Sequence, residues 1–253
     1  MRTLFTALTV SVMTILLGPL AVLAHVLRID ERGHRIQQWC MRTWAQAACL
    51  AAGVRVEVHG LEHVVAERGT IYSSNHVSWF DVFALGSVIP RYTFVAKDEL
   101  RRIPIFGWGA AGAGVIFLSR EHRKSAFEAY HDAAEQVTRG RSVVVFPEGT
   151  RGDSYALRPF KKGPFVLAIA AKAPIVPCVV HGAREVISRT QARVTPGVVH
   201  VHFLAPVPTF MYDYEHRHDL MRIVWDRMAA CLRDTYGVES TDPVVEPSRE
   251  RTA

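Results

Sequence analysis

Seven short runs rich in β-branched and aromatic residues recur along the chain, and helical patterns separate many of them. The runs cover residues 54–60, 70–74, 92–96, 115–118, 142–146, 175–180 and 198–204. Strands that alternate with helices favour an α/β fold, because each helix carries the chain back to begin a parallel strand. We therefore predict a mixed, largely parallel central sheet flanked by helices, preceded by an N-terminal pair of membrane-associated helices.

The first segment carries no formal charge from residue 3 to residue 27. As a helix it would be about 37 Å long, which is enough to cross the hydrocarbon core of a bilayer. Arg28, Arg32 and Arg35 follow it, so the positive-inside rule predicts a cytoplasmic location for the rest of the chain. A cleaved signal peptide ending near Ala24 and a shallow interfacial anchor are the alternatives.

A second helical pattern follows, and it mixes tryptophan with arginine. The residues at helical spacing are Ile36, Trp39, Cys40, Trp44, Ala47 and Leu50, with Arg35 and Arg42 among them. This composition favours a membrane interface, although a helix packed on the core of the domain remains the alternative. The expected divisions are anchoring helices over 1–52, an α/β domain over 53–238 and a disordered tail over 239–253.

The net charge of +6 favours anionic partners such as phospholipid headgroups, phosphorylated small molecules or nucleic acid. The four cysteines are widely scattered and lack the spacing of structural zinc sites, so we expect no metal. Reduced thiols of this kind suit a cytosolic compartment. The sequence GWGAAG at 107–112 matches a dinucleotide-binding pattern, but it leads into a strand, so we expect close packing there instead.

Polar residues collect directly after four of the predicted strands. They are Asn75, His76 and Asp81, then Lys97, then Ser119 and Arg120, and finally Glu148, Thr150 and Arg151. If those strands run parallel, all four sets emerge at one edge of the sheet, where open α/β sheets bind ligands. One crevice would then hold an imidazole, two carboxylates and three cations.

The stretch NHVSWFD, residues 75–81, supports two compatible interpretations. Ser78 and Asp81 approximate a capping box, with Trp79 and Phe80 packed inward and His76 an ordinary loop histidine. A helix that begins near Ser78 also brings Asp81 back towards His76. A carboxylate there would fix the tautomer of the imidazole and leave its other nitrogen as a general base.

The chain offers no well-placed nucleophile for that base. Ser78 is expected to serve the cap, and Cys178 lies in an apolar strand, so we expect it in the core. The substrate would then bring its own hydroxyl group to His76. Lys97, Arg120 and Arg151 would hold a phosphate, since arginine suits bidentate phosphate contacts.

These motifs resemble those of the glycerolipid acyltransferases. NHVSWFD resembles their NHxxxxD block, residues 97–120 resemble the second block and FPEGTR, residues 146–151, resembles the third. FKKGPF and APIVPCVVHG resemble the segments that follow. Order and spacing agree over roughly residues 54–205. Within the family the likeness is greatest to bacterial enzymes that acylate 1-acylglycerol 3-phosphate.

The resemblance implies roles for particular residues. His76 would be the catalytic base and Asp81 its orienting partner. The substrate-binding residues would be Asn75, Ser78, Lys97, Arg120, Glu148, Gly149, Thr150, Arg151 and Pro177. Gly152 stands where the third block usually continues with serine, so no hydroxyl is expected to act there.

The implied reaction transfers a fatty acyl group from acyl-CoA or acyl carrier protein to 1-acylglycerol 3-phosphate, giving phosphatidic acid. The expected partners are this donor and membrane lipids at the cytoplasmic face, without nucleic acid, metal or further cofactor. Other lysolipids, such as lyso-ornithine lipid, are alternative acceptors. A lipid ester or thioester hydrolase and a non-catalytic lipid-binding protein are the alternative functions.

Overall fold

The computed structural model describes residues 1–29, 35–65, 68–118 and 123–241. Its seven-stranded sheet has the order β1-β7-β6-β2-β5-β3-β4. The strands are β1 (Val54–His59), β2 (Ile71–Ser74), β3 (Tyr92–Lys97), β4 (Ile116–Leu118), β5 (Ser142–Val145), β6 (Ile175–His181) and β7 (Gly197–Phe203). All neighbouring strands run parallel except β6 and β7, which are antiparallel. The predicted mixed, largely parallel sheet is confirmed.

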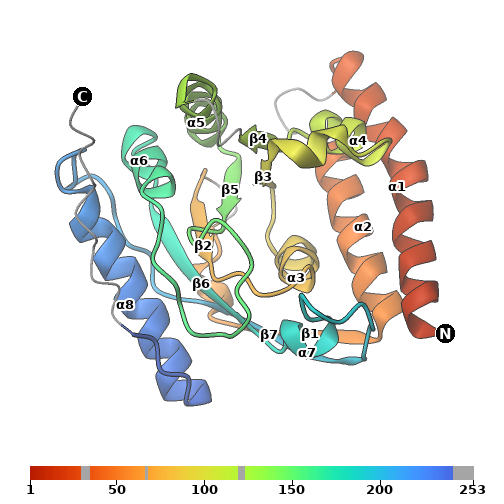
Figure 1. Ribbon diagram of the computed structural model, residues 1–253. Helices are drawn as coiled ribbons and strands as arrows, with labels where there is room; N and C mark the ends of the chain where they lie inside the picture. The colour runs from red at the N-terminus through yellow and green to blue at the C-terminus, as the bar shows by residue number, and fades with distance from the viewer. Residues whose placement is uncertain (30–34, 66–67, 119–122, 242–253) are drawn as a thin grey trace, which may run out of the picture.

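Helices cover both faces of this sheet (Figure 1). The helical elements are α1 (Arg2–Val26), α2 (Arg35–Ala52), η1 (Leu61–His63), α3 (Phe80–Val88), η2 (Asp98–Arg102), α4 (Phe106–Gly112), α5 (Arg123–Thr138), α6 (Gly163–Ala170), α7 (Ala183–Val186) and α8 (Arg217–Tyr236). Helices α5, α6 and α8 lie on one face, and α2, α3 and α7 lie on the other. The expected tail lies almost wholly in residues 242–253, outside the described part of the chain.

The inner strands are apolar on both sides because helices cover both of their faces. In β2, Ile71 packs with the α5, α6 and α8 layer, whereas the next residue, Tyr72, packs with α2 and α3. Cys178 in β6 is fully buried, as the sequence predicts. The continuous hydrophobic runs of the sequence therefore mark the centre of the sheet.

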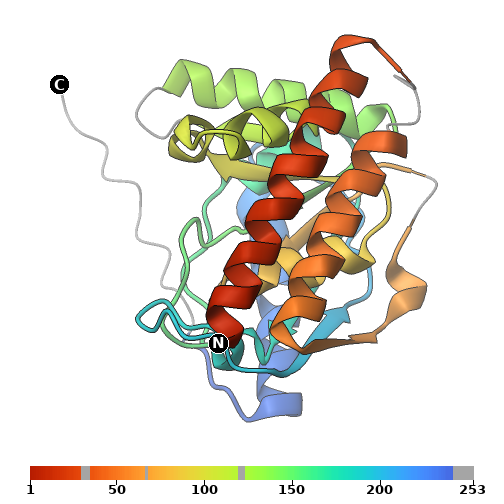
Figure 2. The ribbon, with the colours of Figure 1, turned by 90° about the vertical axis from the view of Figure 1, so that its right-hand side faces the viewer.

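Helix α1 is attached to the rest of the protein along most of its length (Figure 2). Near its start, the Val194 backbone N–H donates to Thr3 Oγ1 at 3.0 Å. At mid-helix, Trp44 Nε1 donates to Thr14 Oγ1 at 3.0 Å. Further along, Gly109 of α4 lies so close that a Cβ there would come within 2.9 Å of Gly18 Cα. The small residues of GWGAAG thus allow close helix packing, as predicted.

The opposite side of α1 is apolar, and no part of the chain that the structure describes covers it. Only 11% of its most apolar 18-residue stretch is buried, and its length and composition would allow it to cross a membrane. The exposed residues are Leu4, Phe5, Leu8, Val12, Ile15, Leu16, Leu20, Leu23 and Val26. An apolar surface of this extent indicates membrane association.

The tryptophans of α2 do not share one surface. Trp39 and Leu50 are exposed, whereas Cys40 is buried. Trp44 turns inward and packs on Phe83 of α3, with 4.8 Å between the ring centroids. The predicted interfacial stripe is therefore divided, because α2 packs against α3 on one side and α1 on another.

Candidate active site

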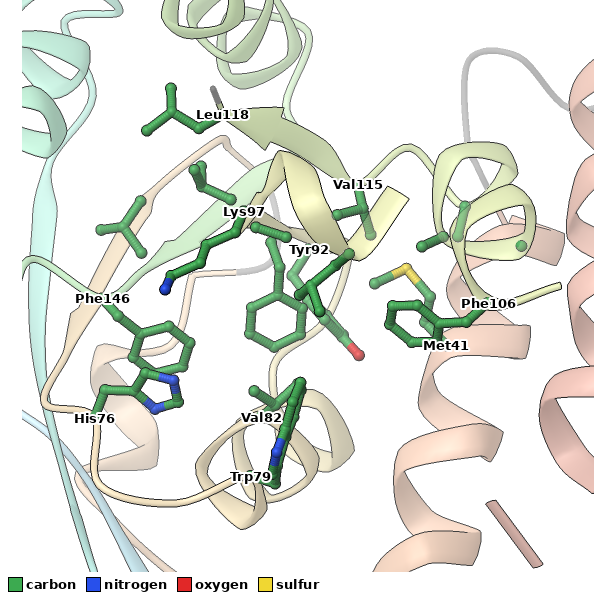
Figure 3. Close-up of a pocket in the computed structure, with 18 of the residues that line it drawn as sticks. Met41, His76, Trp79, Val82, Tyr92, Lys97, Phe106, Val115, Leu118 and Phe146 are labelled. Carbon is green, nitrogen blue, oxygen red and sulfur yellow. The ribbon is translucent and has the colours of Figure 1, made fainter. Parts of the chain in front are cut away.

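The strands β2, β3 and β5 are parallel, so their carboxyl ends meet at one edge of the sheet. His76 follows β2, Lys97 ends β3, and Phe146 follows β5. Figure 3 shows these three side chains at one cavity, with Lys97 reaching towards Phe146 and His76. Arg120 was expected at the same edge, but it lies outside the described residues, as does Ser119.

His76 and Asp81 form the contact on which catalysis would depend. His76 Nδ1 lies 2.8 Å from Asp81 Oδ2, and the carboxyl group is completely buried. The same oxygen accepts hydrogen bonds from the backbone N–H groups of Val77 at 2.7 Å and Ser78 at 2.8 Å. A carboxylate held by these donors accepts the Nδ1 proton, which leaves Nε2 of the imidazole as the basic nitrogen.

The local sequence explains why Asp81 can reach His76. Helix α3 begins at Phe80, so Asp81 lies in its first turn, where a negative charge is favoured. Ser78 Oγ accepts from the Phe80 backbone N–H at 3.1 Å and donates to the Ile187 carbonyl at 2.8 Å. Ser78 therefore serves the start of the helix, as the capping interpretation predicts.

Trp79 was expected to pack inward, but it does not. Its side chain is 41% exposed, whereas Phe80 is 2% exposed and enters the core. Trp79 precedes the first turn of α3 and lines the cavity, where the guanidinium carbon of Arg151 lies 5.1 Å from its ring centroid. The aromatic face thereby attracts and positions the Arg151 cation.

The loop after β5 fixes the backbone of His76. The His76 N–H donates to Glu148 Oε1 at 3.0 Å, and Arg158 Nε donates to Glu148 Oε2 at 2.9 Å. Burial raises the pKa of Glu148, while the bonds from Arg158 and His76 act in the opposite direction. The Gly152 N–H donates to the His76 carbonyl at 2.7 Å. Glu148 therefore positions His76, and it is buried and not among the described residues that line the cavity.

Further contacts fix the positions of the His76 ring and of its neighbour Asn75. The His76 ring stacks on the Phe146 ring, with 3.9 Å between centroids and 18° between planes. Asn75 forms two hydrogen bonds with the backbone of Val180, at 3.0 Å and 2.8 Å. Asn75 is buried, so it links β2 to β6 and does not face the cavity.

Seven of the nine predicted substrate-binding residues separate into two groups. Those that line the cavity are Lys97, Gly149, Thr150 and Arg151. Asn75, Ser78 and Glu148 are buried and bond to other parts of the protein. Pro177 was expected in the pocket lining, but it is buried in the middle of β6 and is not among the described residues that line the cavity. Only the carboxyl end of that strand approaches the edge where His76 lies.

The cavity has a volume of about 800 Å³ and two chemically different ends. The polar end carries His76, Lys97, Arg151 and Lys161. The remainder is mainly apolar and is formed by α1, α2, α3, α4 and the sheet. Its apolar residues include Met13, Leu17, Met41, Trp44, Val82, Phe106, Val115 and Leu118. This arrangement suits a ligand with an anionic headgroup and a long apolar chain.

A family model described as Acyltransferase matches residues 55–181, half of the chain. The chain belongs to the acyltransferase family. A "1-acyl-sn-glycerol-3-phosphate acyltransferase" of Saccharomyces cerevisiae is 32% identical over 236 residues, which are 91% of this chain and 78% of that protein. A "Lyso-ornithine lipid O-acyltransferase" of Rhizobium meliloti is 34% identical over 70% of this chain and 58% of its own length.

The fold of this acyltransferase also has a solved counterpart. The crystal structure of the 1-acyl-sn-glycerophosphate acyltransferase PlsC from Thermotoga maritima superimposes with a TM-score of 0.78. The match covers 94% of this chain and 97% of that one, at 23% sequence identity. At this level of identity the likeness concerns the fold.

Several residues of the acyltransferase site were not assigned from the sequence. Lys161 and Lys162 line the cavity, and they lie in FKKGPF, a segment that matches the family pattern without a role attached. Arg158 bonds to both Glu148 and Thr150 Oγ1, the latter at 3.1 Å. No local motif marks Arg158, because its partners come from a loop eight to ten residues earlier.

Proposed function

We propose that this acyltransferase moves a fatty acyl group from a thioester donor to the free hydroxyl of 1-acylglycerol 3-phosphate, giving phosphatidic acid. One arrangement carries the proposal. His76, which Asp81 orients, lines the same cavity as Lys97, Arg151 and Lys161 and a larger set of apolar residues. The relative in Saccharomyces cerevisiae bears the name of this activity.

The chemistry follows from the free nitrogen of His76. Nε2 takes the proton of the acceptor hydroxyl as its oxygen attacks the thioester carbonyl. The new C–O bond forms, the C–S bond breaks, and the proton on His76 passes to the departing thiolate. The buried Asp81 carboxylate stabilises the imidazolium between these two steps. We propose acyl-CoA or acyl carrier protein as the donor.

Substrate binding divides between the two ends of the cavity. Arg151, Lys97 and Lys161 would contact the phosphate, and Trp79 holds the guanidinium group of Arg151 in place. The apolar part, between the sheet and helices α1, α2, α3 and α4, would receive an acyl chain. In this proposal, Gly149 and Thr150 form the wall beside the phosphate.

The membrane arrangement that we propose is interfacial. Contacts at Thr3, Thr14 and Gly18 attach α1 to the domain, so the helix could not cross a bilayer without losing them. Its exposed apolar face would instead enter one leaflet and bring the cavity close to lipid. The arginines that follow α1 favour the cytoplasmic leaflet.

An acceptor panel tests this proposal. The full chain in detergent receives palmitoyl-CoA or palmitoyl-acyl carrier protein, together with lysophosphatidic acid, lyso-ornithine lipid, lysophosphatidylcholine or no lipid. We expect the highest kcat/KM with lysophosphatidic acid. A higher kcat/KM with lyso-ornithine lipid would instead indicate the activity that the name of the Rhizobium meliloti relative gives. Hydrolysis as the sole reaction would indicate a hydrolase, and binding without turnover would indicate a lipid-binding protein.

Replacing Arg151 with alanine is expected to lower kcat/KM for lysophosphatidic acid by about 10- to 100-fold. The change removes a charge-assisted phosphate contact, which contributes about 1.5–3 kcal/mol. Monoacylglycerol lacks the phosphate, so its slow acylation serves as the control and is expected to change little. Equal losses with both acceptors would contradict a phosphate-binding role for Arg151.

A further inference from the structure

A second cluster of ionisable side chains lies on the β1–β7 side of the sheet, away from β2. Glu57 and His59 project from one face of β1, and His200 projects from β7. Glu57 pairs in register with His200 across this parallel pair of strands. Because β7 is antiparallel to β6, the carboxyl ends of β1 and β7 point away from the edge that holds His76.

Three potential ligand atoms converge in this cluster. His59 Nε2 lies 3.3 Å from His200 Nδ1, and His200 Nδ1 lies 3.4 Å from Glu57 Oε2. All three atoms lie within 4.8 Å of one another. A tetrahedral Zn²⁺ ion with bonds of about 2.0–2.1 Å holds neighbouring ligand atoms about 3.3 Å apart. Two of the three separations therefore already match a coordination sphere, and rotation of the Glu57 carboxylate would complete the third.

Hydrogen bonding alone satisfies this geometry poorly. A neutral imidazole carries at most one proton on Nδ1, yet His200 Nδ1 faces an imidazole nitrogen and a carboxylate oxygen at nearly equal distances. The single proton on Nδ1 can therefore satisfy only one of these two neighbours. A divalent cation would accept electron pairs from all three atoms together. Arg55 bonds to the other carboxylate oxygen, Glu57 Oε1, at 2.6 Å, so Oε2 remains directed towards the histidines.

Neighbouring aromatic rings hold the His59 ring in place. The His59 ring stacks on His202 with 4.3 Å between centroids, and His202 Nε2 lies 2.6 Å from the Tyr236 hydroxyl. Tyr236 in turn stacks on His181, with 3.8 Å between centroids.

We propose that Glu57, His59 and His200 form a binding site for a divalent transition-metal ion of the Zn²⁺ type, with the fourth position open to water. Two imidazoles and one carboxylate are a ligand set that Zn²⁺ favours. The ligands come from two strands far apart in the sequence, so no local spacing motif predicts the site. The site is independent of the proposed acyl transfer, because its strands end at the opposite edge of the sheet from His76.

Metal titration of the full chain tests the proposal. Protein without a histidine tag is stripped with a chelator in detergent and titrated with Zn²⁺ by calorimetry. Co²⁺ is added in a parallel experiment, because its visible absorption reports tetrahedral coordination. We expect one ion per chain and a melting temperature that rises with Zn²⁺. His200→Asn and Glu57→Gln are each expected to weaken Zn²⁺ binding about tenfold or more.

His218→Asn, which changes an exposed histidine of α8 outside the cluster, is the matched control and is expected to bind like the unaltered protein. Melting temperatures in chelator establish that each variant is folded. Absence of a stoichiometric ion in the unaltered protein would overturn the proposal. So would folded His200→Asn and Glu57→Gln variants that bind Zn²⁺ with full affinity.

Discussion

Replacing His76 with alanine is expected to lower kcat by about 10²–10⁴-fold, the contribution that a general base typically makes. The imidazole supplies the basic nitrogen, and the described cavity lining has no second histidine to replace it. The change removes a ring that stacks on Phe146 but leaves the Glu148 bond to the backbone of residue 76. Transfer of labelled palmitate to lysophosphatidic acid measures the effect.

His218→Ala is the control for this experiment, since His218 is an exposed residue on α8. Lysophosphatidic acid binding to catalytically slow His76→Ala should be close to that of the unaltered protein, because the cationic residues are retained. A His76→Ala protein with full transfer activity would show that another group removes the proton. The proposed mechanism would then be wrong, although family membership would stand.

Replacing Asp81 with asparagine is expected to lower kcat by about 10²–10⁴-fold, no more than the loss of His76 itself, because Asp81 acts through the imidazole. Asparagine keeps the shape of the side chain but loses the charge that stabilises the imidazolium. Among the described residues, Asp81 Oδ1 is buried without a hydrogen-bond partner. An amide N–H₂ group in that position would also lack an acceptor, which costs about 1–3 kcal/mol of folding free energy.

The kinetic and thermal effects of Asp81→Asn can be measured separately. Thermal unfolding reports the loss of stability, and turnover below the melting temperature reports the loss of catalysis. Asp226→Asn, an exposed change on α8, is the matched control. If His76 and Asp81 act as one unit, the kcat of the double variant should lie within a few-fold of the kcat of His76→Ala. Additive losses would contradict their coupling.

The sequence was sufficient to predict the sheet and the central pair of residues. Apolar runs separated by helical patterns indicate parallel strands, because few other arrangements bury such runs on both faces. The stretch 75–81 brings His76 and Asp81 together because the first turn of a helix reverses the chain over a few residues. Both inferences depend on periodicity and on neighbours in the chain, which the sequence displays directly.

Tertiary structure decided which polar residues face the cavity. Asn75 and Glu148 point into the protein because their partners, Val180 and Arg158, come from other segments. Trp79 faces the cavity because its ring contacts Arg151, which comes from the loop after β5. The apolar part of the cavity exists because α1 and α2 pack beside the domain and contribute to its lining.

The cluster of Glu57, His59 and His200 is the clearest case of this division. The sequence predicts both of its strands, but only the order of the sheet places β1 beside β7 and aligns Glu57 with His200. Local sequence determines the conformation of a segment through backbone sterics and periodic burial. Contacts between distant segments depend on how the faces of helices and strands pack together. Only the tertiary structure shows that packing.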